Sequence, residues 1–202
     1  AFAGAWAGAA AGQDAAPPAG EHTLDKNHAS ITWRINHLGT SMYVARFDEF
    51  DAALTFDPEA PEESSLSVTV DVASLSLDYD GGPGFYDELM GHPTEENPEG
   101  DQRFFRVAEF PAITFESTDI EVTGENTGTV TGDLTFMGQT HPLTLDVTFN
   151  GSRPAYGMPG TVVGFSGVTT VTRSEWGMGA AVPAIGDEVE VLLEAEFVSA
   201  ES

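Results

Sequence analysis

Apolar and polar residues alternate with a period of two along most of the chain, from about residue 24 to residue 197. Ile31, Trp33 and Ile35, for example, are separated by polar residues. Successive side chains of a β-strand point to opposite faces of a sheet, so this period indicates strands with one buried face, whereas a helix would repeat every 3.6 residues. The other apolar rows are Phe50/Ala52/Leu54/Phe56, Leu66/Val68/Val70/Val72, Ile113/Phe115, Val130/Leu134/Phe136, Leu143/Leu145/Val147/Phe149, Val163/Phe165 and Val189/Val191/Leu193/Ala195/Phe197. Together the rows predict about eight strands.

Turn residues separate these rows. Asp57-Pro58, Thr123–Asn126, Met137–Gln139 and Asn150-Gly151 have the Gly, Pro, Asn and Asp content that is typical of turns. The connection from Met137 to Pro142 is short, as a hairpin between neighbouring strands requires. The sequence therefore predicts an all-β fold, either an antiparallel up-and-down barrel or a sandwich.

One long segment interrupts the alternation. Residues 78–103 contain three prolines, five glycines and a run of acidic residues, and only Phe85–Met90 has the pattern of a single helical turn. An insertion of this length inside a small domain is either functional or mobile. We expect it to form a connection outside the regular strands.

Residues 1–21 are rich in Ala, Gly and Pro and show no period that could build a core. Ala1-Phe2-Ala3 and Ala5-Trp6-Ala7 fit the small-x-small pattern found around a signal-peptidase site. We interpret this segment as a flexible tail, either the end of an export signal with a linker or a cloning remnant. Residues 22–199 then form a single domain, which we predict to be periplasmic or secreted. No stretch reaches the roughly 18 apolar residues of a membrane span, so we do not expect an integral membrane protein.

The charge of the chain excludes two classes of partner. It has 7 Lys and Arg against 33 Asp and Glu, a formal net charge of -26. Nucleic-acid binding needs basic residues to neutralise phosphates, and an anionic membrane surface would repel this chain. A hydrophobic fraction of 41% is too high for a disordered acidic chain. Since Lys26 is the only lysine, the acidity suits either a high-salt environment or an ordinary acidic exported protein.

The sequence contains no recognisable catalytic or metal-binding motif. None of the five histidines occurs at a metal-ligand spacing, and the absence of Cys excludes disulfides and thiolate ligands. Asp78–Gly82, with Asp87 and Glu88 beyond, resembles a calcium loop but lacks the closing Glu at the required spacing. We therefore predict neither a metal site nor catalytic residues.

Several separated segments form an ordered pattern. They are Leu24-Asp25-x-x-His28-Ala29-Ser30-Ile31-x-Trp33, Asn36-His37-Leu38-Gly39-x-Ser41, Phe47-x-x-Phe50, the segment from Phe104-Phe105 to Ser117, the segment from Gly132 to Leu145, and Arg173-Ser174-Glu175-Trp176-Gly177-Met178 with Gly186-Asp187-Glu188-Val189. In their order and spacing these segments closely resemble the YceI-like family of periplasmic polyisoprenoid-binding proteins. The resemblance covers roughly residues 22–198.

The resemblance implies a lipocalin-like antiparallel barrel whose apolar channel holds an isoprenoid chain or a quinone tail. It further implies that the apolar strand faces line a cavity, a point that periodicity alone cannot decide. The chain departs from the family pattern at two places. Tyr86–Met90 replaces the usual Arg-Asp-x-His-Leu and is followed by an acidic insertion from His92 to Gln102, and Ala45 replaces the usual Gly.

The candidate ligand-binding residues are the apolar residues of the predicted strand faces and three aromatic residues near strand ends. Plain core packing is the alternative role for each of them. The set comprises Trp33, Ile35, Phe50, Phe104, Phe105, Phe115, Leu145, Phe165, Trp176 and Val191.

Three functions are compatible with the sequence. The first is non-enzymatic binding or carriage of an isoprenoid lipid, with no cofactor other than the lipid itself. The second is an exported, stress-related barrel with a packed interior and no ligand. The third is an enzyme on the same scaffold, with His37, Asp87 or Glu88 as acid/base groups. The sequence leaves the existence of a homodimer open.

Overall fold

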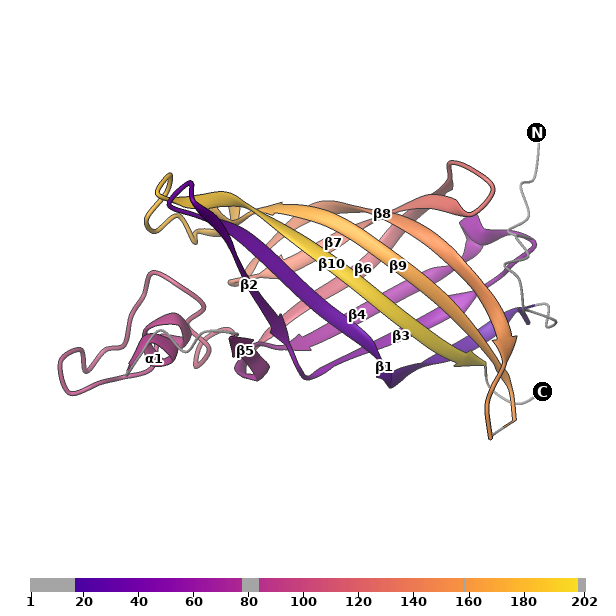
Figure 1. Ribbon diagram of the computed structural model, residues 1–202, viewed down its shortest axis with the longest axis horizontal. Helices are drawn as coiled ribbons and strands as arrows, with labels where there is room; N and C mark the ends of the chain where they lie inside the picture. The colour runs from indigo at the N-terminus through magenta and orange to yellow at the C-terminus, as the bar shows by residue number, and fades with distance from the viewer. Residues whose placement is uncertain (1–16, 78–83, 158, 200–202) are drawn as a thin grey trace.

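The computed structural model describes residues 17–77, 84–157 and 159–199, which form one closed antiparallel β-sheet (Figure 1). The single α-helix of these residues, α1, is the predicted helical turn Phe85–Met90. Three short 3-10 helices also occur: η1 (Pro61–Glu63), η2 (Val72–Ser74) and η3 (Arg173–Trp176). The strands are β1 (Gly20–His37), β2 (Ser41–Phe47), β3 (Phe50–Phe56), β4 (Ser65–Asp71), β5 (Leu75–Leu77), β6 (Ala112–Val122), β7 (Thr127–Phe136), β8 (Gln139–Pro154), β9 (Thr161–Thr172) and β10 (Ile185–Ser199).

These strands occupy eight positions around a barrel. The first part of β1 pairs with β3, where Gly20 faces Phe56, and its last part pairs with β2, where Ile31 faces Phe47. β2 and β3 therefore act as one interrupted strand beside β1. In the same way β4 and β5, which are separated by η2, act as one interrupted strand beside β3 and β2. Each following strand pairs with the one before it, and β10 closes the barrel by pairing with β1. The predicted all-β, up-and-down barrel of about eight strands is thus confirmed.

The alternation predicted from the sequence places one face of each strand inside the barrel. Ile31 and Ile35 of β1 are buried, while Thr32 and Arg34 are not. An eight-stranded barrel has an interior just wide enough to be filled by side chains or to hold one small ligand. How far the side chains fill this interior therefore decides whether a ligand fits.

The predicted turn at Met137–Gln139 is a two-residue hairpin. Phe136 pairs with Gln139, and both Met137 and Gly138 have positive φ angles, as a type I′ turn requires. The turn predicted at Asn150-Gly151 is wrong. β8 continues through these residues to Pro154, and the irregularity in its pairing with β9 between Phe149 and Gly151 is a β-bulge, which Asn-Gly also favours.

A cluster of aromatic side chains fills one end of the barrel, the end where β1 begins and β10 finishes (Figure 1). The rings of Phe56 and Phe165 lie edge to face with centroids 5.6 Å apart, and Phe149 and Phe197 pack against Phe165 at 5.4 Å and 6.3 Å. Such pairs stabilise a core by about 0.5–1.5 kcal/mol each beyond the burial of their surface. This end of the barrel is therefore closed.

The structure refines two predicted boundaries. β1 begins at Gly20, two residues before the domain start predicted at residue 22, and residues 1–16 of the predicted tail lie outside the described residues. The connection between β5 and β6 runs from residue 78 to residue 111, beyond the insertion predicted at 78–103. In the described part of the chain, no helix is long and apolar enough to cross a membrane.

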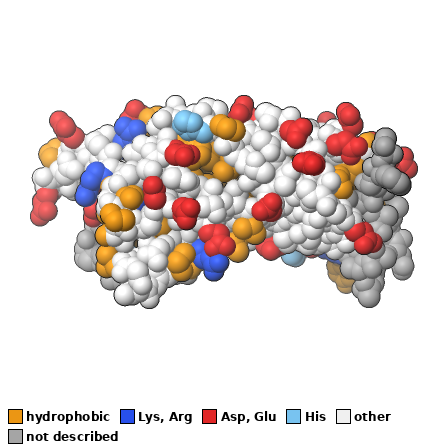
Figure 2. All heavy atoms as spheres, turned by 90° about the horizontal axis from the view of Figure 1, so that it is seen from above, with side chains coloured by type: hydrophobic (Ala, Val, Ile, Leu, Met, Phe, Trp, Pro, Cys, Tyr) orange, Lys and Arg blue, Asp and Glu red, His pale blue; other side chains and the backbone are white. Residues whose placement is uncertain are grey.

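Acidic side chains are scattered over the face of the molecule seen in Figure 2, with few basic ones between them. Repulsion between like charges destabilises a compact state, and salt screens it over a Debye length of about 10 Å at 0.1 M and about 3 Å at 1 M. We expect the melting temperature to rise steadily, by about 5–10 °C, from dilute buffer to molar KCl, which differential scanning calorimetry would measure. A flat profile would mean that the acidity contributes only to solubility.

Candidate functional site

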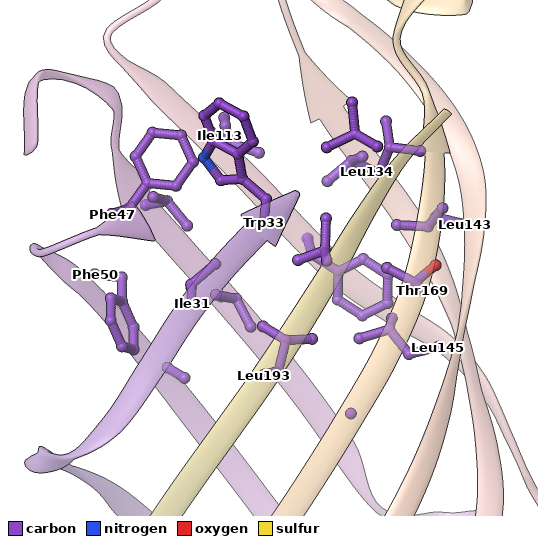
Figure 3. Close-up of a pocket in the computed structure, with 18 of the residues that line it drawn as sticks. Ile31, Trp33, Phe47, Phe50, Ile113, Leu134, Leu143, Leu145, Thr169 and Leu193 are labelled. Carbon is purple, nitrogen blue, oxygen red and sulfur yellow. The ribbon is translucent and has the colours of Figure 1, made fainter. Parts of the chain in front are cut away.

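A cavity of about 740 Å³ lies inside the barrel (Figure 3). This volume falls within the roughly 300–1,000 Å³ of small-molecule sites. The labelled side chains of Figure 3 come from strands around the barrel and point into this space; they include Ile31, Ile113, Leu143 and Leu193, with Thr169 as a polar exception. The interior is thus hollow over part of its length, and its wall is mainly apolar.

Nine of the ten candidate residues line this cavity. They come from strands β1, β3, β6, β8, β9 and β10 and from the connection before β6, so residues far apart in the sequence meet around one space. These nine are Trp33, Ile35, Phe50, Phe104, Phe105, Phe115, Leu145, Phe165 and Val191.

Trp176 is the exception, because it does not line the cavity. It lies in η3, is buried, and packs edge to face against His141 with ring centroids 5.0 Å apart. A second, polar hollow of about 310 Å³ borders it on the outside of β8 and β9. Its position at a strand end was predicted, and it packs within the main hydrophobic core without bordering the cavity.

The connection between β5 and β6 completes the barrel wall at the other end. β5 pairs with β2 along one edge, and no strand of the described residues pairs with its other edge. Phe105 packs against Phe47 of β2 and Phe136 of β7, with ring centroids 6.1 Å and 6.0 Å apart. Its backbone N–H donates to the Leu89 carbonyl of α1 at 3.0 Å. Phe105 therefore covers the space between β2 and β7, and α1 holds it there.

The cavity opens at this same end. Tyr43, Phe85 and Ile185, which line it there, are only partly buried, and His37 is exposed. At the opposite end Leu24 and Phe56 line the cavity and are buried. A ligand would therefore enter between the β1–β2 turn, the β9–β10 connection and α1.

Arg173 anchors the β9–β10 connection beside this opening. It lines the cavity but is only 4% exposed, and burial lowers the pKa of its guanidinium, an effect that the nearby Asp187 carboxylate opposes. The guanidinium donates to four backbone carbonyls: those of Gly186 (2.8 Å), Met178, Ala180 (2.8 Å) and Ile185 (3.2 Å). A side chain that binds four carbonyls of one loop fixes the path of that loop.

The rest of the same sequence motif has a structural role as well. The Ser174 backbone N–H and hydroxyl donate to the two carboxylate oxygens of Asp187, at 3.0 Å and 2.7 Å. The segments Arg173–Met178 and Gly186–Val189, which contribute to the family resemblance, thus hold the connection between β9 and β10 in place.

The residues suggested for acid/base chemistry do not form a common site. Asp87 accepts a hydrogen bond from His92 at 2.9 Å, and Glu88 is paired with Arg103 at 2.7 Å. Neither carboxylate lines the cavity, whereas His37 does. Residues 78–82 of the suggested calcium loop lie outside the described residues.

One group of side chains on the outer surface has the composition of a metal site. Ligand atoms of Asp25, His28 and Glu196 all lie within 4.8 Å of one another. Glu196, however, is paired with Arg153 at 2.7 Å, and Asp25 accepts from His28 Nδ1 at 2.9 Å. Arg153 and His28 already occupy oxygens of these carboxylates, and we do not assign a metal to them.

The Asp25–His28 pair predicts a measurable titration. The hydrogen bond that His28 donates to the Asp25 carboxylate, followed by the negative charge of Asp25, raises the pKa of His28 above its ordinary value near 6.5. Because this pKa is raised on folding, the stabilisation by the pair is fully present below the ordinary value and is lost as the pH rises through the folded value. In an NMR titration Asp25→Asn should move the pKa of His28 back toward 6.5; an unchanged midpoint would contradict the pairing.

The structure also identifies lining residues that were not among the candidates. Leu134 and Phe136 lie on an apolar row that the sequence analysis recognised, and Phe47 alternates with polar neighbours in the same way. Gly167 is in phase with Phe165 on β9, but a glycine carries no apolar signal. No sequence pattern marked Arg173 as a residue of the cavity wall.

A closed antiparallel barrel around an apolar cavity with one open end defines a class of proteins that enclose small apolar ligands. The YceI-like domain matches residues 22–197, and the chain belongs to this family. A UPF0312 protein of Pseudomonas putida is 35% identical over 163 residues, 79% of this chain and 77% of that protein. These matches confirm the resemblance predicted from the sequence.

Two solved structures share the fold. BcnA of Burkholderia cenocepacia superimposes with a TM-score of 0.70 at 24% identity, covering 86% of this chain and 98% of BcnA. A polyisoprenoid binding domain from Saccharophagus degradans, implicated in plant cell wall breakdown, gives a TM-score of 0.61 at 12% identity, covering 91% of this chain and 100% of that domain.

Proposed function

We propose that this protein binds or carries an isoprenoid lipid, such as a polyprenyl chain or a quinone tail, inside the barrel without chemically changing it. The observation that carries the proposal is the 740 Å³ cavity with its mainly apolar wall. The structural likeness to a polyisoprenoid binding domain supports the same ligand class. The nine lining candidates, from Trp33 to Val191, are the proposed contacts.

Burial of apolar surface is sufficient to hold such a chain. Each buried CH₂ group contributes about 0.8 kcal/mol, so one five-carbon isoprene unit contributes about 3–4 kcal/mol before the ordering of the chain is subtracted. Two or three units inside the cavity therefore give useful affinity without an ion pair. The cavity argues against the alternative of a barrel with a packed interior, since a core packed to native density leaves few voids larger than a water molecule.

The proposal includes no catalytic step and no cofactor. The absence of Asp87 and Glu88 from the residues that line the cavity supports a binding function over an enzyme on this scaffold. An exported location, periplasmic or secreted, agrees with the Ala-rich N-terminal sequence. A homodimer is not needed for the cavity, because one chain builds the whole of it.

Titration with a fluorescent farnesyl probe tests the proposal, followed by competition with unlabelled prenyl alcohols of increasing length. We expect saturable binding, and affinity that tightens about tenfold or more with each added isoprene unit until the cavity is full. Absence of saturable binding, or an affinity independent of chain length, would contradict the proposal.

A further inference from the structure

Two neighbouring loops at the open end of the barrel carry no Lys, Arg, Asp or Glu. They are residues 37–45, around the β1–β2 turn, and residues 176–186, between η3 and β10. Charged residues make up 20% of the chain, so twenty residues of average composition would carry about four charges. The absence of charge here contrasts with the acidic side chains scattered over the barrel wall (Figure 2).

The two loops form one rim. The Leu38 backbone N–H donates to the Ala184 carbonyl at 2.8 Å, which joins them directly. The Ile185 N–H donates to the Ala181 carbonyl at 2.9 Å, and Arg173 binds the Ala180 carbonyl from inside. In Figure 1 the β1–β2 turn and the β9–β10 connection lie side by side at the upper left. The rim is therefore a preformed surface at the cavity opening.

This rim exposes large apolar side chains. Leu38 is 59% exposed, Met42 46% and Val182 39%. The other two large apolar side chains exposed in the described residues lie elsewhere: Tyr156 near the closed end and Val168 on the barrel wall. Exposed apolar side chains beside a ligand opening, without charged residues between them, are typical of a surface that contacts a membrane or another protein.

From these observations we propose that the rim, which we define as residues 37–45 and 176–186, docks on a lipid bilayer with no net charge. This inference rests on the proposed function, because an isoprenoid chain resides in a bilayer and must pass from the bilayer into the cavity. Shallow insertion of Leu38, Met42 and Val182 would bring the opening to the acyl chains without exposing the cargo to water.

The charges near the opening determine which kind of bilayer surface the rim can approach. The rim itself attracts no anionic headgroups, and Glu95, Glu96 and Glu99 lie exposed in the connection that borders the same opening. An anionic surface would repel these residues and the rest of the chain, within a Debye length of about 10 Å at 0.1 M salt. A zwitterionic surface would not.

A second copy of the chain fits the rim less well. A stable protein interface buries at least about 1,000 Å² in total and is well packed. The rim exposes only three large apolar side chains, Leu38, Met42 and Val182, which suits shallow insertion between lipids better than contact with a matching copy of itself.

The absence of cysteine allows a site-specific test. An environment-sensitive NBD fluorophore is attached to Leu38→Cys, and to Tyr156→Cys as the matched control at the closed end. With phosphatidylcholine vesicles we expect the emission of the Leu38→Cys label to shift to the blue and to rise several-fold, and that of the Tyr156→Cys label to stay constant. With phosphatidylglycerol vesicles the change should be weaker in dilute buffer and recover in molar KCl.

A second measurement connects docking to cargo exchange. In the variant Leu38→Gln/Met42→Gln/Val182→Gln we expect transfer of a fluorescent prenyl lipid from phosphatidylcholine vesicles to slow about tenfold. Binding of a short soluble prenyl probe should be unchanged, and Tyr156→Gln/Val168→Gln should change neither.

Three results would overturn the rim proposal. The first is no response of the Leu38→Cys label to phosphatidylcholine vesicles, and the second is an equal response of both labels. The third is sedimentation of the wild-type protein as a dimer that the triple Gln variant dissociates, which would make a second copy the occupant. The vesicle experiment needs no cargo, so a failure of prenyl binding would leave its result intact.

Discussion

Replacing Gly167 with phenylalanine is expected to abolish isoprenoid binding while the barrel stays folded. Gly167 lies on the inner face of β9, where a Cβ atom would meet the Cδ1 atom of Leu193 at 3.3 Å and the Cδ2 atom of Leu145 at 3.9 Å. Both are ends of flexible side chains, so the backbone need not move and the aromatic ring would occupy the cavity. We expect the affinity for the farnesyl probe to fall at least a hundredfold, which corresponds to about 2.7 kcal/mol.

Val168→Phe is the matched control for this variant. Val168 is the next residue of the same strand, but its side chain is 41% exposed on the outer surface. We expect its probe affinity to equal that of the wild type. The melting temperature of Gly167→Phe should stay within a few degrees of the wild type. Glycine destabilises the interior of a strand and phenylalanine is favoured there, so the substitution offsets the cost of the tight contact with Leu193. Full prenyl affinity in folded Gly167→Phe would place the ligand somewhere other than in the cavity.

Replacing Arg173 with alanine should produce the largest loss of stability among substitutions at the open end. Four backbone carbonyls would lose their donor, and each buried acceptor left unpaired costs about 1–3 kcal/mol unless water reaches it. We expect the free energy of unfolding in guanidinium chloride to fall by about 3–5 kcal/mol. Arg173→Lys should recover little of this loss, because one ammonium nitrogen cannot reach carbonyls that a planar guanidinium spans.

Arg46→Ala provides the comparison. Arg46 pairs with Asp48 at 2.7 Å, and both side chains are about half exposed. Exposed pairs contribute about 1 kcal/mol or less, so this variant should unfold close to the wild type. A similar small loss in Arg173→Ala would show that the β9–β10 connection does not depend on its buried guanidinium.

The period of two was sufficient to predict the strands and most of the residues that face the interior, because alternation reports directly which face of a strand is inside. The choice of a barrel over a sandwich came from the family resemblance. Ile31, Trp33 and Ile35 are examples: all three line the cavity. What alternation cannot distinguish is a packed interior from a hollow one, since both require the same apolar face. That distinction depends on whether the total volume of the inward side chains from all eight wall positions fills the barrel interior.

Sequence reasoning was wrong where local residue preferences have more than one structural use. Asn150-Gly151 favours a turn, but it also favours the β-bulge that the structure contains. Trp176 lies at a strand end as predicted, yet in η3 it packs against His141 and does not border the cavity. The contacts of Phe105 with β2 and β7 join segments that only the closed barrel brings together.

The central claim is that the cavity holds an isoprenoid lipid. Native mass spectrometry tests this claim most directly. The protein is expressed in cells of its natural source and purified without detergent, and bound lipids are identified after solvent extraction. We predict a stoichiometric adduct whose mass corresponds to a polyprenyl or quinone-type lipid, and its absence from Gly167→Phe. An empty wild-type protein that also fails to take up the farnesyl probe would contradict the claim.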